Sequence, residues 1–231
     1  MLRELISIFR SSDPLREMGE RFAAMLRIAR ELILKSGEIF FENKEAPDER
    51  TWIYDHDIEV NELQREIRKR VIAHLSLSSN KLHLPYGLLL VSLVKDVERI
   101  GDYAKNLIEI SEFFPGPLPD DDLVAELREI RQGVETAFAG MERILEESDQ
   151  TAALGLIQQG KSIARRCDML VVKTAKSSYD ASTTAAVVLG ARYYKRIGGH
   201  VLNILSSVVM PLHKLDYYDE DAIPEELRTR S

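Results

Sequence analysis

The chain has 231 residues, of which 45% are hydrophobic and 30% charged, and it carries a formal net charge of -7. This composition is typical of a helical globular protein, and the acidic balance excludes a general nucleic-acid binder, because such proteins gather Lys and Arg to displace counterions from phosphates. The single cysteine, Cys167, excludes an intrachain disulfide and a cysteine-based zinc site, so we expect a buried thiol in a cytoplasmic protein.

Residues 1–10 lack the long apolar run and the small-residue cleavage site of a signal peptide. We expect a short amphipathic segment that either docks on a partner or covers the end of a bundle, and the second role is favoured. Asp13 and Pro14 are suited to the start of a helix. Beyond them, apolar residues recur at alternating steps of three and four, which predicts one amphipathic helix running towards Phe40.

Two further helices are predicted in the first half. Residues 43–51 break the first pattern, and the apolar positions of the next helix share one face, namely Val60, Leu63, Ile67 and Val71. After a loop over 76–84, Pro85 opens a third helix that extends to about Phe114. The segment 115–119 contains three prolines, which lack a backbone donor and restrict the residue before them, so we expect a linker there.

The second half is predicted to repeat this arrangement. Asp120 to Asp122 can cap a fourth helix, and a fifth and a sixth are expected over about 150–177 and about 183–212. The uncharged stretch 197–212 is shorter than the roughly 20 residues that span a bilayer, which predicts a buried core helix.

The elements together predict an all-α fold of two tandem, pseudo-symmetric three-helix bundles. The first domain would cover residues 1–115 and include the N-terminal amphipathic segment. The second would cover residues 116–231 and end in an acidic tail after Tyr217.

A short block supports this duplication. The triplet Arg-Ile-Gly, followed five positions later by Asn, begins at Arg99 and recurs 97 residues further on. Glu98 and Asp102 flank the triplet in the first copy, whereas Lys195 and Gly199 hold those positions in the second. Only the first copy therefore carries carboxylates.

Helical spacing places Glu98 and Asp102 on one stripe outside the apolar face of their helix. Asp57 and Asn61 on the preceding helix are also four residues apart, so the four side chains could converge if the two helices pack together. Oxygen-bearing side chains suit a hard divalent cation. Acids at this spacing are nevertheless common on solvated helices, and a charged outer face is the favoured interpretation on spacing alone.

Other positions of the motif have plainer interpretations. For Arg99 and Asp96, a position on the solvated surface is the favoured interpretation. Gly101 and Gly198 each cost about 1 kcal/mol relative to alanine within a helix. Since both fall on or near the apolar arc, we expect a neighbouring helix to approach closely at each glycine.

The stretch from Lys95 to Leu107, which includes Glu98-Arg99-Ile100-Gly101-Asp102 and Asn106, resembles the signature of the PhoU family of phosphate-uptake regulators. The stretch from Asp57 to Ile67 resembles the preceding helix of that family, and the paired bundles cover nearly the whole chain. The N-terminal segment is similar to that of the subgroup associated with sodium-phosphate cotransporters.

This resemblance implies a non-enzymatic cytoplasmic protein that regulates phosphate uptake or phosphate-starvation signalling by binding a membrane phosphate transporter or a sensor kinase. Its membrane association would be peripheral and through that partner, and a homodimer is left open. Some family members carry iron or zinc clusters, which would assign Glu98, Asp102, Asp57 and Asn61 as metal ligands here. Because Lys195 and Gly199 replace the acids in the second half, at most one divalent metal site is expected, in the N-terminal half.

Two alternatives remain open from the residues. The first is a carboxylate-bridged metal enzyme in a helical bundle, although the chain lacks the Glu-x-x-His pair of such enzymes. The second is a structural adaptor that binds no metal. No nucleophile arrangement and no Gly-rich phosphate loop can be recognised in the sequence.

Overall fold

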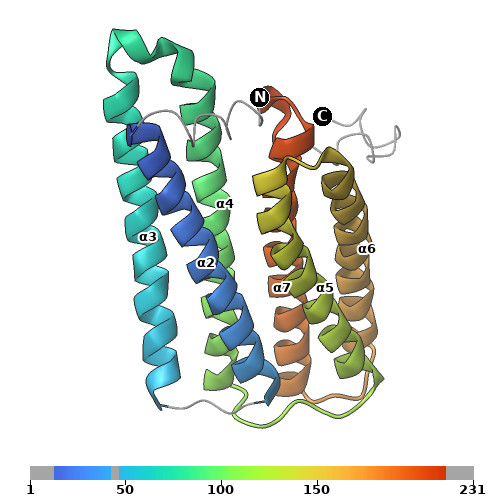
Figure 1. Cartoon of the computed structure of the whole chain (residues 1–231). Helices are drawn as coiled ribbons and strands as arrows, with labels where there is room; N and C mark the ends of the chain where they lie inside the picture. The colour runs from blue at the N-terminus through green and yellow to red at the C-terminus, as the bar shows by residue number, and fades with distance from the viewer. Residues whose placement is uncertain (1–12, 43–46, 217–231) are drawn as a thin grey trace, which may run out of the picture.

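The computed structural model describes residues 13–42 and 47–216, and this part of the chain contains six long α-helices (Figure 1). They are α2 (Asp13–Glu42), α3 (Pro47–Leu75), α4 (Leu84–Glu109), α5 (Asp122–Glu147), α6 (Gln150–Ala175) and α7 (Ala181–Val209). Short 3-10 helices follow at η1 (Ser78–His83), η2 (Ile110–Glu112) and η3 (Leu212–Lys214). The predicted N-terminal segment and the acidic tail after Tyr217 lie outside the described residues.

The helices form two three-helix bundles that lie side by side. Helices α2, α3 and α4 pack on one another, as do α5, α6 and α7, which confirms the predicted all-α fold. The two bundles are joined by an extensive contact between α4 and α7 and a smaller one between α2 and α5. Helix α4 is therefore covered on two sides, by its own bundle and by the other.

The ends of the helices follow the local sequence. Asp121 is the N-cap of α5 and accepts hydrogen bonds from the backbone N–H groups of Leu123 and Val124, as the acidic run at 120–122 predicts. Asp149 and Asp180 cap α6 and α7 in the same way. Each such cap stabilises its helix by about 1 kcal/mol.

Two helix boundaries differ from the prediction. Helix α3 begins at Pro47, inside the predicted break over 43–51. Helix α4 begins at Leu84 with a proline in its first turn but ends at Glu109, where η2 continues the chain as a tighter turn.

The apolar stripes meet in one continuous core. The predicted core helix after 197 is buried, with Ile197, Val201 and Leu205 at 0% exposure. Cys167 is also buried, and burial raises the pKa of its thiol to about 12, which makes it a core residue and not a nucleophile. Within the described ranges, no helix is long and apolar enough to cross a membrane.

The close helix approach predicted at Gly101 and Gly198 is wrong. A Cβ added to Gly101 would lie 3.5 Å from Leu32 Cδ1, and one added to Gly198 would lie 3.5 Å from a methyl group of Val134, both ordinary contacts. Tighter approaches lie at other glycines, such as Gly160, where an added Cβ would be 2.5 Å from a methyl group of Leu202. The duplicated glycines are therefore not required by packing.

Candidate functional site

The acidic motif faces α3 across the first bundle. Helix α4 carries Asp102 and Lys105, and α3 carries Asp57, whose side chain is only 7% exposed. The Lys105 Nζ lies 2.7 Å from Asp57 Oδ2 and 3.5 Å from Asp102 Oδ1. The structure thus brings two of the predicted ligands together, and the cation between them is the ammonium of Lys105.

The charges around this lysine fix its protonation. Partial burial lowers the pKa of Lys105, but the hydrogen bond and the charge of Asp57, together with those of Asp102, outweigh burial and raise it. The ammonium is therefore charged at neutral pH and holds α4 against α3. It also removes the repulsion that two carboxylates would otherwise have.

Glu98 lies one turn before Asp102 and is less solvated than a surface acid. Its pKa is raised, first by burial and then by the negative charge of Asp102, while Arg99 and Arg68 oppose the rise. Arg99 Nη1 donates a hydrogen bond of 3.1 Å to Asp102 Oδ2, and its side chain is 52% exposed, as the surface prediction requires.

The four predicted metal ligands are not equally placed. Asp57, Glu98 and Asp102 are near one another, whereas Asn61 makes no hydrogen bond recorded in the described structure. Over residues 13–42 and 47–216, no group of three or more His, Cys, Asp or Glu side chains has an arrangement that could hold a metal ion. A divalent cation at Asp57 and Asp102 would compete with the Lys105 ammonium, and the metal site stays a prediction.

The second bundle has a related link. Lys195, at the position of Glu98 in the repeat, lies 2.6 Å from Asp168 Oδ2 on α6. Both bundles therefore join their second and third helices through a Lys–Asp pair. In the first bundle the lysine lies on the same helix as the acids of the motif, whereas in the second the acid, Asp168, lies on the neighbouring helix.

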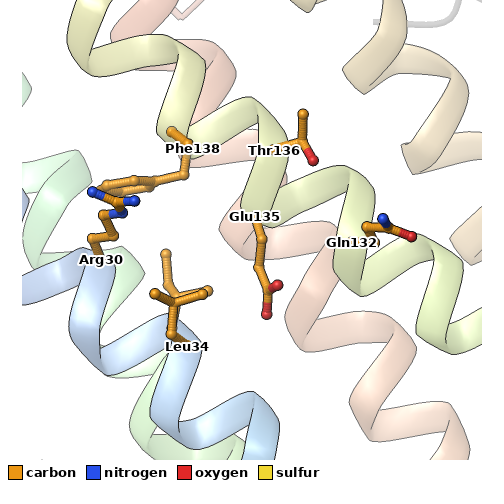
Figure 2. Close-up of a pocket in the computed structure, with 8 residues that line it drawn as sticks. Arg30, Leu34, Gln132, Glu135, Thr136 and Phe138 are labelled. Atoms are coloured by element: carbon orange, nitrogen blue, oxygen red, sulfur yellow. The ribbon is translucent and has the colours of Figure 1, made fainter.

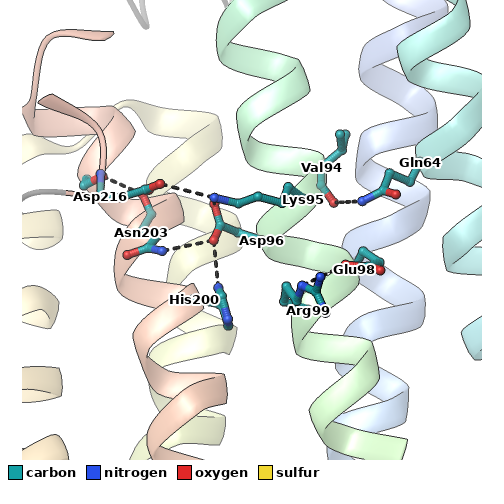
Figure 3. Close-up of polar contacts among 10 residues, drawn as sticks. Gln64, Val94, Lys95, Asp96, Glu98, Arg99, His200, Asn203 and Asp216 are labelled. Atoms are coloured by element: carbon teal, nitrogen blue, oxygen red, sulfur yellow. Dashed lines mark hydrogen bonds and ion pairs between the residues drawn. The ribbon is translucent and has the colours of Figure 1, made fainter. Parts of the chain in front are cut away.

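Sequence reasoning missed the most buried acid of the motif. Asp96, expected on the surface, has a side chain that is 1% exposed, between α4 and α7 (Figure 3). Its Oδ1 lies 2.7 Å from His200 Nδ1 and accepts a hydrogen bond of 3.0 Å from Asn203 Nδ2. Both partners belong to the other bundle, so this cluster links the two halves of the protein.

A lysine completes the cluster. Asp96 Oδ2 is buried without a hydrogen bond, and Lys95 Nζ lies 3.8 Å from it. The same Nζ lies 3.3 Å from Asp216 Oδ2, beyond the end of α7, and the ring of Tyr103 stacks on His200. The contacts of Asp96 and Lys95 thus extend from α4 to α7 and to the segment that follows it.

One sequence signal pointed to this cluster. Asp96 lies between Leu93 and Ile100 at helical spacing, so it sits on an apolar stripe of α4. Asn203, the last residue of the second copy of the block, is the Asn that binds it. The duplicated Asn therefore has a polar partner, although its own copy lacks the acids.

A shallow pocket lies between α2 and α5 (Figure 2). It has a volume of about 220 Å³, and Arg30 and Glu135 are its only charged lining residues within the described chain. Glu135 accepts a hydrogen bond of 2.6 Å from Arg131. Since its one acid is already paired and its other charged residue is an arginine, the pocket offers no acid–base pair for catalysis.

Comparisons with known proteins agree with the predicted family. A model of the PhoU domain matches residues 15–111. The chain is similar to the crystal structure of PhoU from Pseudomonas aeruginosa, with a TM-score of 0.75 and 18% identity over 87% of this chain and 97% of that one. It is also similar to the phosphate transport system regulatory protein PhoU from Streptococcus pneumoniae, with a TM-score of 0.69 and 16% identity over 84% of this chain and 92% of that one. No curated protein sequence matches the chain significantly.

Proposed function

Since residues 15–111 of this chain form a PhoU domain, we propose that the protein regulates phosphate transport and phosphate-starvation signalling, and that it does so in the cytoplasm by binding a membrane transporter or a sensor kinase. The domain match is the observation that carries this proposal. The two solved structures with the same fold, one of them a phosphate transport system regulatory protein, support it.

The geometry of the motif favours binding over catalysis. Asp57 and Asp102 are held by Lys105, and Asp96 is buried between the bundles. A carboxylate that is paired or buried in this way holds neighbouring helices in place and is not available to transfer a proton to a substrate. Glu98 and Asp102 remain partly exposed, each paired with Arg99, and the three side chains present a mixed pattern of charge to a partner.

The genetic test is deletion of the gene. We expect deletion to change both phosphate uptake and phosphate-responsive transcription, and the intact gene to restore them. Unchanged uptake and transcription in the deletion strain would count against the proposal. Capture of a phosphate transporter or a sensor kinase from detergent-solubilised membranes by the full chain would identify the partner.

We also propose one divalent metal site, of iron or zinc, at Glu98, Asp102 and Asp57, with Asn61 on the same side of α3. The match to the PhoU domain supports it. Two observations oppose it: Lys105 lies between two of the acids, and no three acids of the described residues are arranged to hold a metal ion. Metal analysis of protein purified without chelator tests the site. The Lys105→Gln variant should bind more metal than the natural chain, and the Lys195→Gln variant serves as the control in the second bundle.

A further inference from the structure

Exposed apolar side chains gather at one end of the first bundle. We call residues 72–88 the hairpin tip; they include the end of α3, η1 and the start of α4. Five of the ten exposed large hydrophobic side chains of the described chain lie in these 17 residues, and they are Ile72, Leu77, Leu82, Leu84 and Leu88. Figure 1 shows this hairpin extending beyond the first turn of α2, so the third helix of the bundle does not cover it.

The hairpin tip is a built structure. Asn80 Nδ2 donates a hydrogen bond of 2.9 Å to the carbonyl of His74, and the His74 and His83 ring nitrogens lie 2.8 Å apart. Gly87 lets α4 approach α3, because a Cβ there would lie 2.7 Å from Leu75 Cδ1. Internal contacts therefore hold the turn, while Leu82 at its end remains 90% exposed.

The charge of this region is opposite to that of the protein. Residues 72–88 contain Lys81 and no Asp or Glu, in a chain of net charge -7, and three basic residues come just before them on α3, namely Arg68, Lys69 and Arg70. Arg70 is paired with Glu17 and Glu66 beside the tip. Lys69 and Lys81 are exposed. The tip thus combines exposed leucines with positive charge.

We propose that the hairpin tip docks on an anionic phospholipid bilayer. Apolar side chains that enter the boundary between headgroups and acyl chains, with lysines beside them at the phosphates, are the combination that binds an anionic membrane surface. The acidic remainder of the protein is repelled by the same surface, which orients the tip towards it. This contact goes beyond the proposed regulation, because it involves lipid directly and needs no transporter.

A second copy of the chain fits the tip less well. In a two-fold symmetric contact the same patch would face itself, and Lys69 and Lys81 would meet like charges, because the tip itself carries no acid. A bilayer that contains anionic lipid satisfies both the leucines and the lysines.

Co-sedimentation of the full chain with vesicles tests the proposal. We expect binding to phosphatidylcholine vesicles that contain phosphatidylglycerol, weaker binding to phosphatidylcholine alone, and a decrease as salt screens the lysines. The Leu77→Glu, Leu82→Glu double variant should lose about tenfold in partitioning for each leucine removed from the bilayer. Leu154→Glu is the matched control, since this leucine is 52% exposed on α6 and should leave binding unchanged.

Several results would overturn the proposal. One is that the natural chain binds neither kind of vesicle. Another is that the natural chain and the double variant bind equally well. A third is that Leu154→Glu loses as much binding as the double variant. Light scattering that shows a dimer dissociated by the double variant, without vesicle binding, would assign the tip to a second copy. Binding that survives the double variant and disappears when residues 1–12 are removed would assign it to the N-terminal segment. Thermal melting controls for folding, and the assay contains no phosphate transporter, so its result is independent of the proposed function.

Discussion

The buried cluster between α4 and α7 makes the sharpest prediction about stability. His200→Ala removes one of the two hydrogen-bonding side chains of Asp96 and leaves Asn203 as the other. The Asp96 side chain is 1% exposed, and Lys95 at 3.8 Å is the cation left beside it. Leaving a buried acceptor without one of its hydrogen-bond partners costs about 1–3 kcal/mol, and since the Asp96 side chain is almost fully buried, we expect the upper end, about 3 kcal/mol.

Asp96→Asn provides the matched comparison. The amide oxygen can still accept from His200 and Asn203, and no buried charge remains, so we expect a loss of about 1 kcal/mol, the value of a single hydrogen-bond change. In the double variant the Asp96→Asn substitution has replaced the carboxylate by an amide, so removing His200 no longer leaves a buried carboxylate short of a hydrogen-bond partner. The double-mutant cycle should therefore give a coupling energy of about 2 kcal/mol between the two positions.

Urea unfolding of the four proteins at pH 7, followed by circular dichroism, measures these free energies. A loss of 3 kcal/mol is a large part of the 5–15 kcal/mol that stabilises a typical domain, so the midpoint shift is easily observed. Equal slopes would show that the unfolded states are comparable. A His200→Ala loss below about 0.5 kcal/mol, or additive effects of the two substitutions, would refute the cluster as a link between the bundles.

Four further substitutions test the helix packing and the charged residues of the motif. Gly101→Ala should stabilise by about 1 kcal/mol because the Cβ fits and helix propensity improves, whereas Gly160→Ala should destabilise by about 1–3 kcal/mol through overpacking, and thermal melts compare the two. Lys105→Met leaves the nearly buried Asp57 without its cation and should cost about 2–3 kcal/mol at pH 7. Because folding raises the pKa of Lys105, its contribution to stability is complete below the pKa of the unfolded chain and is lost as the pH rises through the pKa of the folded protein. Urea unfolding at alkaline pH should therefore show this loss in the natural chain and not in the Lys105→Met variant. Glu98→Gln should raise stability slightly at pH 7, because a raised pKa means that the charged form of Glu98 is unfavourable in the folded protein. The gain should vanish at acid pH, where the natural residue is protonated. A gain that does not depend on pH would contradict this explanation.

The helices and their order could be predicted from the amino-acid sequence. Apolar residues at steps of three and four, capping aspartates such as Asp121, and the prolines of 115–119 act over a few neighbouring residues, so they can be read without knowing the fold. The duplicated block and the resemblance to the PhoU family followed from the same local reading, and the family model over 15–111 confirms the resemblance.

The contacts of the motif's charged residues depend on how the helices pack, and they could not be predicted from the sequence. A helical wheel gives one apolar face, but α4 packs against both bundles, which buries Asp96 beside His200, a residue 104 positions away. The same packing brings Lys105 between Asp57 and Asp102, where the resemblance to the PhoU family had suggested a metal ion. The physical reason is that burial and pairing of a charge depend on groups brought together from distant parts of the chain, and the energy of a carboxylate changes far more with those neighbours than with its position on its own helix.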